Sequence, residues 1–451
     1  MTRVITYGTF DLFHEGHRRL LERARSLGDY LIVGVTTEGY DDTRGKLNVR
    51  DSLVERLRKV TESGLADEVI VEEYEGQKIR DIQRYNIDVF VIGSDWEGKF
   101  DYLADYCEVV YLDRTKGVSS TELRQADGII RLGVVGAGRI ARRFVRESRH
   151  VSGVDAVTVW ARDPVKRRAF ADAFELPGTS GSFEELLSEV DAVYIASPHE
   201  THVPYARQAL GAGVHVLCEK PMGLRADEVV ELYDLADERG LVLLEALKTA
   251  FAPGFQRMVA IARGGTIGSI RSVDATFTKL IRTGREVDSP VGGAITELAS
   301  YPLLAITKLL GDNPDEIICR AFKPEDSLVE QFARIDLAYP HAIATAKVGI
   351  GVKSEGDLVV AGTQGYLYVP SPWWLTEYFE TRFEDPRENR KYYYKYDGDG
   401  LRYELAEFMI MIRDRAAESF KLRRGESVAL ARIIEQARAN PCVFGLEHGG
   451  A

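Results

Sequence analysis

The stretch that decides the fold is VITYGTFDLFHEGHRRLLERARSLG, residues 4–28. An apolar strand run is followed by a glycine turn, and a helical pattern then begins near His14. A second stretch of the same design, IIRLGVVGAGRIARRFVRES, occupies residues 129–148. A strand, a glycine turn and a helix in this order mark the start of an α/β unit. The sequence therefore predicts two α/β units, one after the other.

Each opening is followed by apolar strand runs that alternate with helical patterns. After the first, strands are expected at residues 30–36, 67–73, 88–94 and 108–114, with helices at 54–63 and 77–85. After the second, strands are expected at residues 156–162, 192–197, 215–221 and 241–246, with helices ending at 174, 212 and 239. Buried strand runs separated by helices predict parallel, doubly wound sheets.

The pattern changes beyond about Pro253. Alternating segments rich in β-forming residues occupy 271–281, 330–339, 342–352, 357–369 and 390–397, and helical patterns recur at 303–310, 403–416 and 427–439. This part is predicted to be an α+β domain with a large, mostly antiparallel sheet. The whole chain is thus expected to be α/β, with domains 1–127, 129–252 and 253–451 and a linker at 125–128.

Bulk composition narrows the class of protein. The chain has 451 residues, more than one hydrophobic core usually holds, and its net charge of −12 argues against nucleic-acid and anionic-membrane partners. The four cysteines are far apart, and no apolar run is long enough to span a bilayer. We expect a cytoplasmic protein without a zinc site or disulfide framework, and with no metal site made by protein groups alone.

Residues 8–17, GTFDLFHEGH, are the first dense group of chemical side chains. His14 and His17 share one face at the start of a helix, whose free amides and positive dipole favour an anion. A triphosphate attacked at its α-phosphorus needs such positioning and electrostatic stabilisation. The alternative is that both histidines are ordinary residues of a helix start. Residues 114–121 offer a second anion cradle, in which Arg114 stands beside hydroxyls that open a helix, although a plain helix N-cap is again the alternative.

These motifs carry a family resemblance. GTFDxxHxGH resembles the HxGH signature of the nucleotidyltransferase superfamily, and RTKGVSST is similar to that superfamily's RTxGISTT motif. Over residues 1–124 the chain resembles the glycerol-3-phosphate cytidylyltransferases most closely. One departure is the loop at 41–51, which carries an extra residue before Arg56.

The resemblance implies roles for individual residues. His14 and His17 would stabilise the α-phosphate, and Lys46 and Arg114 would bind phosphates. CTP, accompanied by Mg²⁺, would also contact Gly8, Thr9, Phe10, Ser119, Ser120 and Thr121. The acceptor would be bound by Asp11, Arg56, Asp95 and Trp96.

The glycine turn at 133–141 predicts a dinucleotide site. Gly136 and Gly138 permit a tight turn and a close approach of the backbone to a pyrophosphate, while Arg139 and Ile140 open the helix. At the end of the next strand, Ala161 stands where an NAD site usually has a carboxylate, and Arg162 follows it. We therefore expect NADP(H); the alternative is NAD(H), with Asp163 binding the ribose.

Two later turns follow buried strands, at the edge where ligands bind in open α/β sheets. One holds Ser197, Pro198 and His202, and the other holds the sequence Glu219-Lys220-Pro221. We expect Ser197, Pro198 and His202, together with Glu219 and Lys220, to bind the dinucleotide. With the glycine turn and the β-rich domain, this Glu-Lys-Pro motif resembles the Gfo/Idh/MocA oxidoreductase family from Ile130 to about Gly445. The resemblance implies that Lys220 contacts the substrate and the nicotinamide ribose.

The family's proton-transfer motif corresponds to residues 292–302, GGAITELASYP. Glu297 and Tyr301 are four residues apart and are expected on one helix face. Tyr301 would be the acid/base at the substrate oxygen, and a packed helix tyrosine is the alternative. Four cations, Lys248, Lys279, Arg282 and Arg285, would suit a phosphorylated substrate or would be solvated strand ends.

Together these features predict a bifunctional enzyme. The oxidoreductase would reduce a small ketose or triose phosphate to a polyol phosphate, and the first domain would convert that product and CTP to a CDP-polyol, a precursor of cell-wall polymers. Two alternatives stay open: the oxidoreductase acts on a CDP-linked or nucleotide-sugar substrate, or one half is only a binding or regulatory module. We also expect a homo-oligomer.

Overall fold

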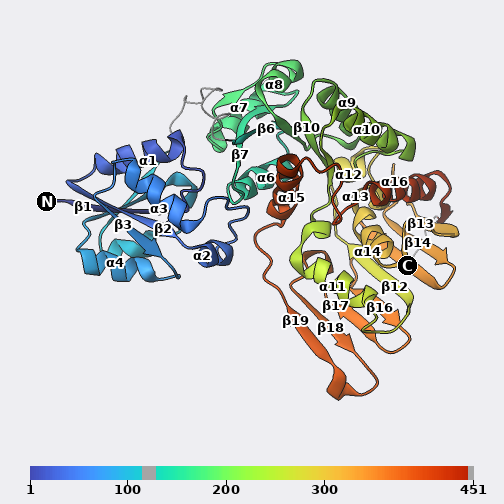
Figure 1. Cartoon of the computed structure of the whole chain (residues 1–451). Helices are drawn as coiled ribbons and strands as arrows, with labels where there is room; N and C mark the ends of the chain where they lie inside the picture. Colours follow the sequence, from blue (N-terminus) through green and yellow to red (C-terminus); the bar gives the residue numbers. More distant parts are fainter. Residues whose placement is uncertain (114–127, 445–451) are drawn as a thin grey trace. The chain divides into compact units, whose positions relative to one another are not determined.

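The computed structural model describes residues 1–113 and 128–444 (Figure 1). The chain divides into two compact units. The first consists of Met1–Gly133 and Arg142–Val190, and the second of Val134–Ala141 and Asp191–Ala451. The predicted α/β class is confirmed, whereas the predicted domain limits stay a prediction. No helix of the described residues is long and apolar enough to cross a membrane.

The N-terminal sheet has five parallel strands in the order β3-β2-β1-β4-β5. They are β1 (Arg3–Gly8), β2 (Tyr30–Thr36), β3 (Glu68–Glu72), β4 (Val89–Gly93) and β5 (Glu108–Leu112). The helices are α1 (Glu15–Arg25), α2 (Glu38–Thr43), α3 (Leu53–Glu62) and α4 (Gln77–Tyr85). The strand order reverses between β1 and β4, which is where open α/β sheets bind ligands.

Alternation of apolar side chains along these strands explains why both faces of the sheet are covered. Val4 packs with Leu21 of α1 and Val60 of α3, whereas its neighbour Ile5 packs with Ile82 of α4. Successive residues of a strand point to opposite faces, so one apolar run serves two cores. The doubly wound arrangement predicted for this region is confirmed.

The second sheet has six strands in the order β11-β10-β9-β6-β7-β8. They are β6 (Ile130–Val135), β7 (Val154–Trp160), β8 (Gly178–Thr179), β9 (Ala192–Ile195), β10 (His215–Glu219) and β11 (Leu243–Ala246). The helices are α6 (Arg139–Ser148), α7 (Pro164–Ala173), α8 (Phe183–Glu189), α9 (His202–Gly211) and α10 (Ala226–Arg239). This strand order is that of dinucleotide-binding folds, with its reversal between β6 and β9.

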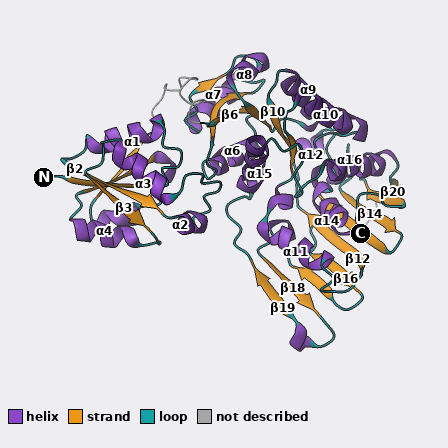
Figure 2. Ribbon diagram, in the orientation of Figure 1, coloured by secondary structure: helices purple, strands orange, loops and turns teal. Residues whose placement is uncertain are grey.

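The third sheet has nine strands in the order β19-β18-β17-β16-β12-β15-β14-β13-β20 (Figure 2). They are β12 (Ile270–Thr278), β13 (Glu316–Phe322), β14 (Phe332–Tyr339), β15 (Ala342–Gly349), β16 (Leu358–Gly362), β17 (Tyr366–Val369), β18 (Tyr378–Arg382), β19 (Arg390–Tyr393) and β20 (Cys442–Phe444). Only the pairs β12–β15 and β13–β20 are parallel, so the predicted mostly antiparallel sheet is confirmed.

The helices of this last part are α11 (Pro253–Arg263), α12 (Arg285–Asp288), α13 (Ala294–Leu298), α14 (Ser300–Leu310), α15 (Leu401–Asp414) and α16 (Arg424–Ala439). The prediction of one helix carrying both Glu297 and Tyr301 was wrong, because the chain forms α13 and α14 with Ala299 between them. Pro302 explains the break: it has no N–H to donate to the carbonyl of Leu298.

Candidate active sites

The first unit contains a cavity of about 440 Å³ at the carboxyl ends of β1 and β4. Eight of the predicted transferase residues line it, namely Gly8, Thr9, Phe10, Asp11, His14, His17, Lys46 and Trp96. Residues between 145 and 177, which belong to the same unit, complete its wall. The cavity thus brings together most of the described residues that the nucleotidyltransferase motifs predicted.

His14 and His17 lie against each other at the start of α1. His14 is the N-cap: its Nδ1 accepts the amide of Gly16 at 3.0 Å, while its own amide donates to Nδ1 of His17 at 3.4 Å. The two ring centroids are 4.0 Å apart. Because both Nδ1 atoms accept, the hydrogen-bond network assigns the proton of each neutral ring to Nε2. The capping geometry and the predicted catalytic geometry are therefore compatible.

The protonation state of His17 follows from its surroundings. Burial, and then the nearby His14 and Lys46, lower the pKa of His17 well below its ordinary value. The ring is therefore neutral at physiological pH and offers one N–H donor. The buried ring of Phe10 lies 5.4 Å from that of His17, so Phe10 supports the histidine from the protein side.

Asp11 connects this turn to the loop before α3. Its Oδ1 accepts the backbone amides of Arg50 and Asp51, at 3.0 and 2.8 Å. Its Oδ2 is buried and has no hydrogen-bond partner within the described residues. Since Asp11 also lines the cavity, one carboxylate oxygen is placed to meet a polar group of a ligand.

Arg56 differs from the prediction, because its guanidinium is fully buried instead of facing an acceptor. It donates to the carbonyls of Thr9 and Thr36, at 2.9 and 2.8 Å, and lies 3.4 Å from Oδ2 of buried Asp41. The inward face of α3 carries it into the protein, where it holds the turn that follows β1. Lys46, by contrast, lines the cavity as predicted, and its Nζ donates to the carbonyl of Arg149 at 3.0 Å.

Replacing Arg56 with methionine is expected to lower the free energy of unfolding by about 3 kcal/mol, because Asp41 loses the cation buried beside it. Urea unfolding followed by circular dichroism measures this. Arg58→Met is the matched control, since Arg58 lies on the same helix with an exposed side chain and forms only surface ion pairs. A wild-type stability for Arg56→Met would contradict the structural role.

Four predicted phosphate-binding residues, Arg114, Ser119, Ser120 and Thr121, lie outside the described residues. The backbone of Asp95 belongs to a 3₁₀ turn, Ser94–Trp96, but its side chain is not described. Trp96 lines the cavity, and the guanidinium of Arg44 lies 5.7 Å from its ring centroid.

The glycine turn after β6 has the shape that a pyrophosphate requires. Gly136 has a φ of +110°, and a Cβ at this position would meet the carbonyl oxygen of Ala196 at 2.6 Å. Only glycine fits there, so the backbone remains open to a close approach. Arg139 begins α6 with Ile140 behind it, and its guanidinium contacts Glu286 at 3.0 Å.

Arg162 and Asp163 follow β7 and behave differently. Arg162 is exposed. Asp163 caps α7, with its Oδ1 accepting the amides of Val165 and Lys166 at 2.9 and 3.2 Å. The carboxylate that an NAD ribose would need is thus engaged by the helix start.

His202 is also engaged by the protein. Its buried ring lies between two backbone carbonyls, with Nδ1 2.9 Å from that of Pro221 and Nε2 2.9 Å from that of Ser197. This differs from the predicted contact with a cofactor, because both ring nitrogens face backbone oxygens. The hydroxyl of Thr201 lies 2.7 Å from that of Ser197 and 2.6 Å from the carbonyl oxygen of Pro198, and these contacts further fix the turn.

The Glu-Lys-Pro turn follows β10 and places its two charged side chains differently. Glu219 is buried and accepts the hydroxyl of Tyr194 at 2.6 Å, and burial raises the pKa of its carboxyl group. Lys220 extends to Glu297, whose backbone carbonyl accepts its Nζ at 2.8 Å. The same Nζ lies 5.5 Å from the ring centroid of Tyr301. Lys220, Glu297 and Tyr301 thus come together as predicted.

His199, which the sequence analysis did not single out, completes this group. Its Nε2 lies 2.9 Å from Oε1 of Glu297, and its side chain is buried. Burial alone would raise the pKa of Glu297, but the hydrogen bond from His199 and the charge of Lys220 outweigh it and lower the pKa to about 2. The sequence signal that could have identified His199 is the presence of two histidines in one short turn after a buried strand.

Two of the four other candidate cations have different partners. Lys248 Nζ donates to the carbonyl of Asp399 at 2.6 Å, and Arg285 lies 3.7 Å from Glu200. No group of three or more His, Cys, Asp or Glu residues that could hold a metal occurs among the described residues.

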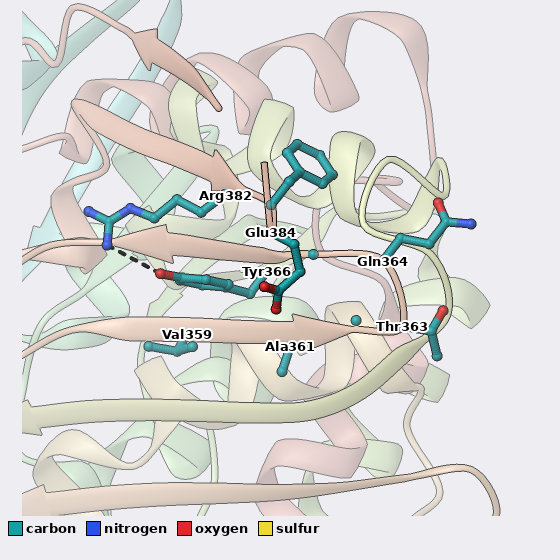
Figure 3. A pocket seen from close by; sticks show the side chains of 10 residues that line it. Val359, Ala361, Thr363, Gln364, Tyr366, Arg382 and Glu384 are labelled. Atoms are coloured by element: carbon teal, nitrogen blue, oxygen red, sulfur yellow. Dashed lines mark hydrogen bonds between the residues drawn. The ribbon is translucent and has the colours of Figure 1, made fainter. Parts of the chain in front are cut away.

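A second cavity, of about 400 Å³, is lined by the ends of β16, β17 and β18 (Figure 3). Arg382 and Tyr366 point toward each other there, and the guanidinium donates to the phenol oxygen at 3.4 Å. Arg382 also contacts Glu380 at 2.7 Å. None of the predicted site residues in the described part of the chain lines this cavity, and we assign it no part in either reaction.

Three family models match the chain in succession. Residues 5–126 match a cytidylyltransferase-like family, residues 130–247 match an oxidoreductase family with an NAD-binding Rossmann fold, and residues 255–368 match the GFO/IDH/MocA C-terminal domain.

Individual proteins agree with these matches. Glycerol-3-phosphate cytidylyltransferase of Bacillus spizizenii is 53% identical over 125 residues, which are 28% of this chain and 96% of that protein. Trans-1,2-dihydrobenzene-1,2-diol dehydrogenase of Mus musculus is 32% identical over 319 residues, which are 68% of this chain and 96% of that protein. The crystal structure of a 3-ketoreductase from Actinomadura kijaniata with NADP and TDP-benzene has a TM-score of 0.64 at 22% identity, and the match covers 71% of this chain and all of that one. This last likeness shows the fold alone. The chain therefore belongs to the cytidylyltransferase-like family over its N-terminal part and to the Gfo/Idh/MocA oxidoreductase family over the part that follows, as a fusion of the two.

Proposed function

We propose that the two halves work on one substrate. The oxidoreductase reduces a small ketose or triose phosphate with NADPH, and the transferase joins the resulting polyol phosphate to CTP, giving a CDP-polyol and pyrophosphate. The observation that carries the proposal is that one chain contains a nearly full-length counterpart of a glycerol-3-phosphate cytidylyltransferase and one of a diol dehydrogenase. A polyol phosphate is the kind of compound that both could share.

In the transferase half, a phosphate oxygen of the polyol phosphate forms a bond to the α-phosphorus of CTP. The bond between that phosphorus and the bridging oxygen breaks, and pyrophosphate leaves with the electron pair. The Nε2–H groups of His14 and His17 donate hydrogen bonds to the α-phosphate oxygens, on which negative charge develops. The position of both histidines at the start of the helix supports this arrangement. Lys46 supplies positive charge beside them, and Asp11 orients the acceptor. Mg²⁺ accompanies CTP and neutralises part of its charge.

In the oxidoreductase half, NADPH supplies the hydride that the keto carbon accepts. The turn at Gly136 and Gly138 with Arg139, Ile140, Ser197 and Pro198 would hold this cofactor. Tyr301 transfers its phenolic proton to the substrate oxygen as the carbonyl becomes a hydroxyl group. The ammonium of Lys220, near the tyrosine ring, stabilises the phenolate that remains. His202 supports the turn through its contacts with backbone carbonyls and takes no part in the proton transfer.

Arg162 is proposed to bind the 2′-phosphate that distinguishes NADP(H) from NAD(H). Replacing it with alanine is expected to raise the KM for NADPH about 10- to 100-fold, which is the loss of a charge-assisted hydrogen bond, and to leave the KM for NADH unchanged. Steady-state kinetics with both cofactors measures this. Arg168→Ala, at another exposed arginine of the following helix, is the control. Equal effects on NADPH and NADH would contradict the assignment.

A second candidate substrate is a CDP-linked or other nucleotide-linked compound. The 3-ketoreductase of the same fold was crystallised with NADP and TDP-benzene, which makes this alternative specific enough to test. If it holds, NADPH consumption requires the nucleotide-linked ketone and not the free ketose phosphate.

The direct test measures the halves separately with the full-length protein. Small ketose phosphates, including dihydroxyacetone phosphate, are screened with NADPH, and polyol phosphates are screened with CTP for pyrophosphate release. We expect at least one ketose phosphate whose reduced product is accepted by the transferase. If none of the products of the reductase supports pyrophosphate release from CTP, the shared substrate is contradicted. If the intact chain lacks one of the two activities, the corresponding half is a binding or regulatory module. A homo-oligomer in the cytoplasm completes the proposal, and light scattering of the purified protein tests the assembly.

A further inference from the structure

The turn after β9 carries two buried histidines three residues apart. His199 begins a 3₁₀ turn, His199–Thr201, and His202 begins α9. Their side chains are 7% and 1% exposed, and their rings meet edge to face with centroids 5.4 Å apart. The two histidines have different polar partners, and both sets of partners connect to Lys220.

His202 acts on the backbone beside Lys220. Its Nδ1 lies 2.9 Å from the carbonyl oxygen of Pro221, the residue that follows the lysine, and its Nε2 lies 2.9 Å from the carbonyl oxygen of Ser197. Burial lowers the pKa of His202 to about 3, so the ring is neutral and has one N–H; in the Nδ1-protonated tautomer that N–H donates to Pro221 while the ring packs against the end of β9. This contact fixes where the side chain of Lys220 starts.

His199 acts on the other end of the lysine through Glu297. Its Nε2 lies 2.9 Å from Oε1 of Glu297, and the backbone carbonyl of the same glutamate accepts Nζ of Lys220 at 2.8 Å. Because α13 has only five residues, a side-chain contact at Glu297 restrains the carbonyl next to it. The position of the ammonium group thus depends on the imidazole.

The contact between His199 and Glu297 is surrounded by both positive and negative side chains. Arg285 and Lys220 both lie near the Glu297 carboxylate, and Arg285 also contacts Glu200, the neighbour of His199. Nδ1 of His199 is buried and has no hydrogen-bond partner within the described part of the chain. Among the described residues, Nε2 is therefore the only ring nitrogen of His199 that has a polar partner.

We propose that His199 and His202 form a two-histidine bracket that positions Lys220 against Tyr301, with His202 holding the lysine backbone and His199 holding its ammonium group through Glu297. Both histidines are positioning residues. The bracket deepens the proposed function, because it rests on Lys220 and Tyr301 being the reacting pair. It also explains why a conspicuous histidine such as His202 can belong to the site without touching the cofactor.

Crystal structures of His199→Leu and His199→Gln test the bracket without any knowledge of the substrate. In the leucine variant, Nζ of Lys220 is expected to leave the carbonyl of Glu297; in the glutamine variant, whose amide still donates to Glu297, the contact is expected to remain. His215→Gln is the control, since His215 begins β10 at the other end of the strand and accepts the amide of Val242. An unmoved lysine in the leucine variant overturns the proposal.

Kinetics supplies a second readout that a purely structural role would not move. His199→Leu is expected to slow hydride transfer about tenfold, the loss expected for one hydrogen bond, and to shift the basic limb of its pH profile to higher pH, because Tyr301 loses the nearby ammonium that favours its phenolate. His199→Gln should recover most of the rate. The dissociation constant of NADPH should stay within about threefold in both variants. An unchanged dissociation constant also shows that the oxidoreductase part of each variant is folded. If no ketose phosphate is reduced at all, the proposed function fails while the crystal structures still decide the bracket.

Discussion

Replacing His17 with alanine is expected to slow cytidylyl transfer about 10²- to 10³-fold, the usual loss when one donor to a developing oxyanion is removed. The reason is the fixed direction of its proton: Nδ1 accepts the amide of His14, so Nε2–H is the donor that remains. CTP-dependent pyrophosphate release with a polyol phosphate measures the effect. Because the pKa of His17 is lowered, the wild-type ring should remain a neutral donor below pH 6.5, and the rate should not follow an ordinary histidine titration.

Arg18→Ala is the matched control for this variant, since Arg18 is the next residue of α1 and its exposed side chain pairs with Glu22. NADPH-dependent reduction by the His17 variant should equal that of the wild type, which shows that the oxidoreductase half is intact, and its circular dichroism spectrum should match that of Arg18→Ala. A His17→Ala protein that retains most of its transferase rate would contradict the role of the histidine pair.

Replacing Tyr301 with phenylalanine is expected to lower kcat/KM for the redox reaction about 10²- to 10⁴-fold, because the phenol that transfers the proton is lost while the ring remains. The ring of Tyr301 packs edge to face on Phe277 at 5.1 Å, so phenylalanine can occupy the same place. Stopped-flow measurement of NADPH oxidation gives the rate, and fluorescence titration gives the affinity for NADPH, which should not change.

Tyr339→Phe is the control for a lost phenol in the same sheet domain, since its hydroxyl donates to the backbone carbonyl of Gly311 at 3.1 Å, away from Lys220 and Glu297. That variant should reduce substrate at the wild-type rate. If Tyr301→Phe does the same, the proton comes from another group and the packed-tyrosine interpretation of Tyr301 holds.

Much of the fold could be predicted because its strands are apolar runs between glycine turns. Strands β1, β2, β4 and β10 are buried on both faces, and such runs stand out in one sequence. Strands β13, β18 and β20 were not predicted. In β13 the apolar Ile318 and the charged Arg320 are both exposed, so apolar and polar residues do not alternate along its sequence. Strand β20 is exposed along its whole length. Strands of this kind are fixed by their neighbours in the sheet and not by their own pattern.

The candidate sites show the same division between local and long-range information. Residues tied to a turn, such as His14, Gly136 and Lys220, could be found from local motifs. Arg56 could not be placed, because its burial depends on Asp41, which belongs to helix α2 and lies fifteen residues earlier in the sequence. His199 was missed because its partner Glu297 is 98 residues away in the sequence. Contacts across such separations leave no periodic trace in a single chain.

The claim that both halves serve one substrate is tested most directly by supplying the intact protein with dihydroxyacetone phosphate, NADPH and CTP together and following the products by mass spectrometry. We expect a CDP-linked polyol whose formation needs all three compounds. His17→Ala should accumulate the polyol phosphate, and Tyr301→Phe should form the CDP-linked product only when polyol phosphate is added. The shared substrate would be contradicted if small ketose phosphates are reduced with NADPH but none of the resulting polyol phosphates is accepted by the transferase.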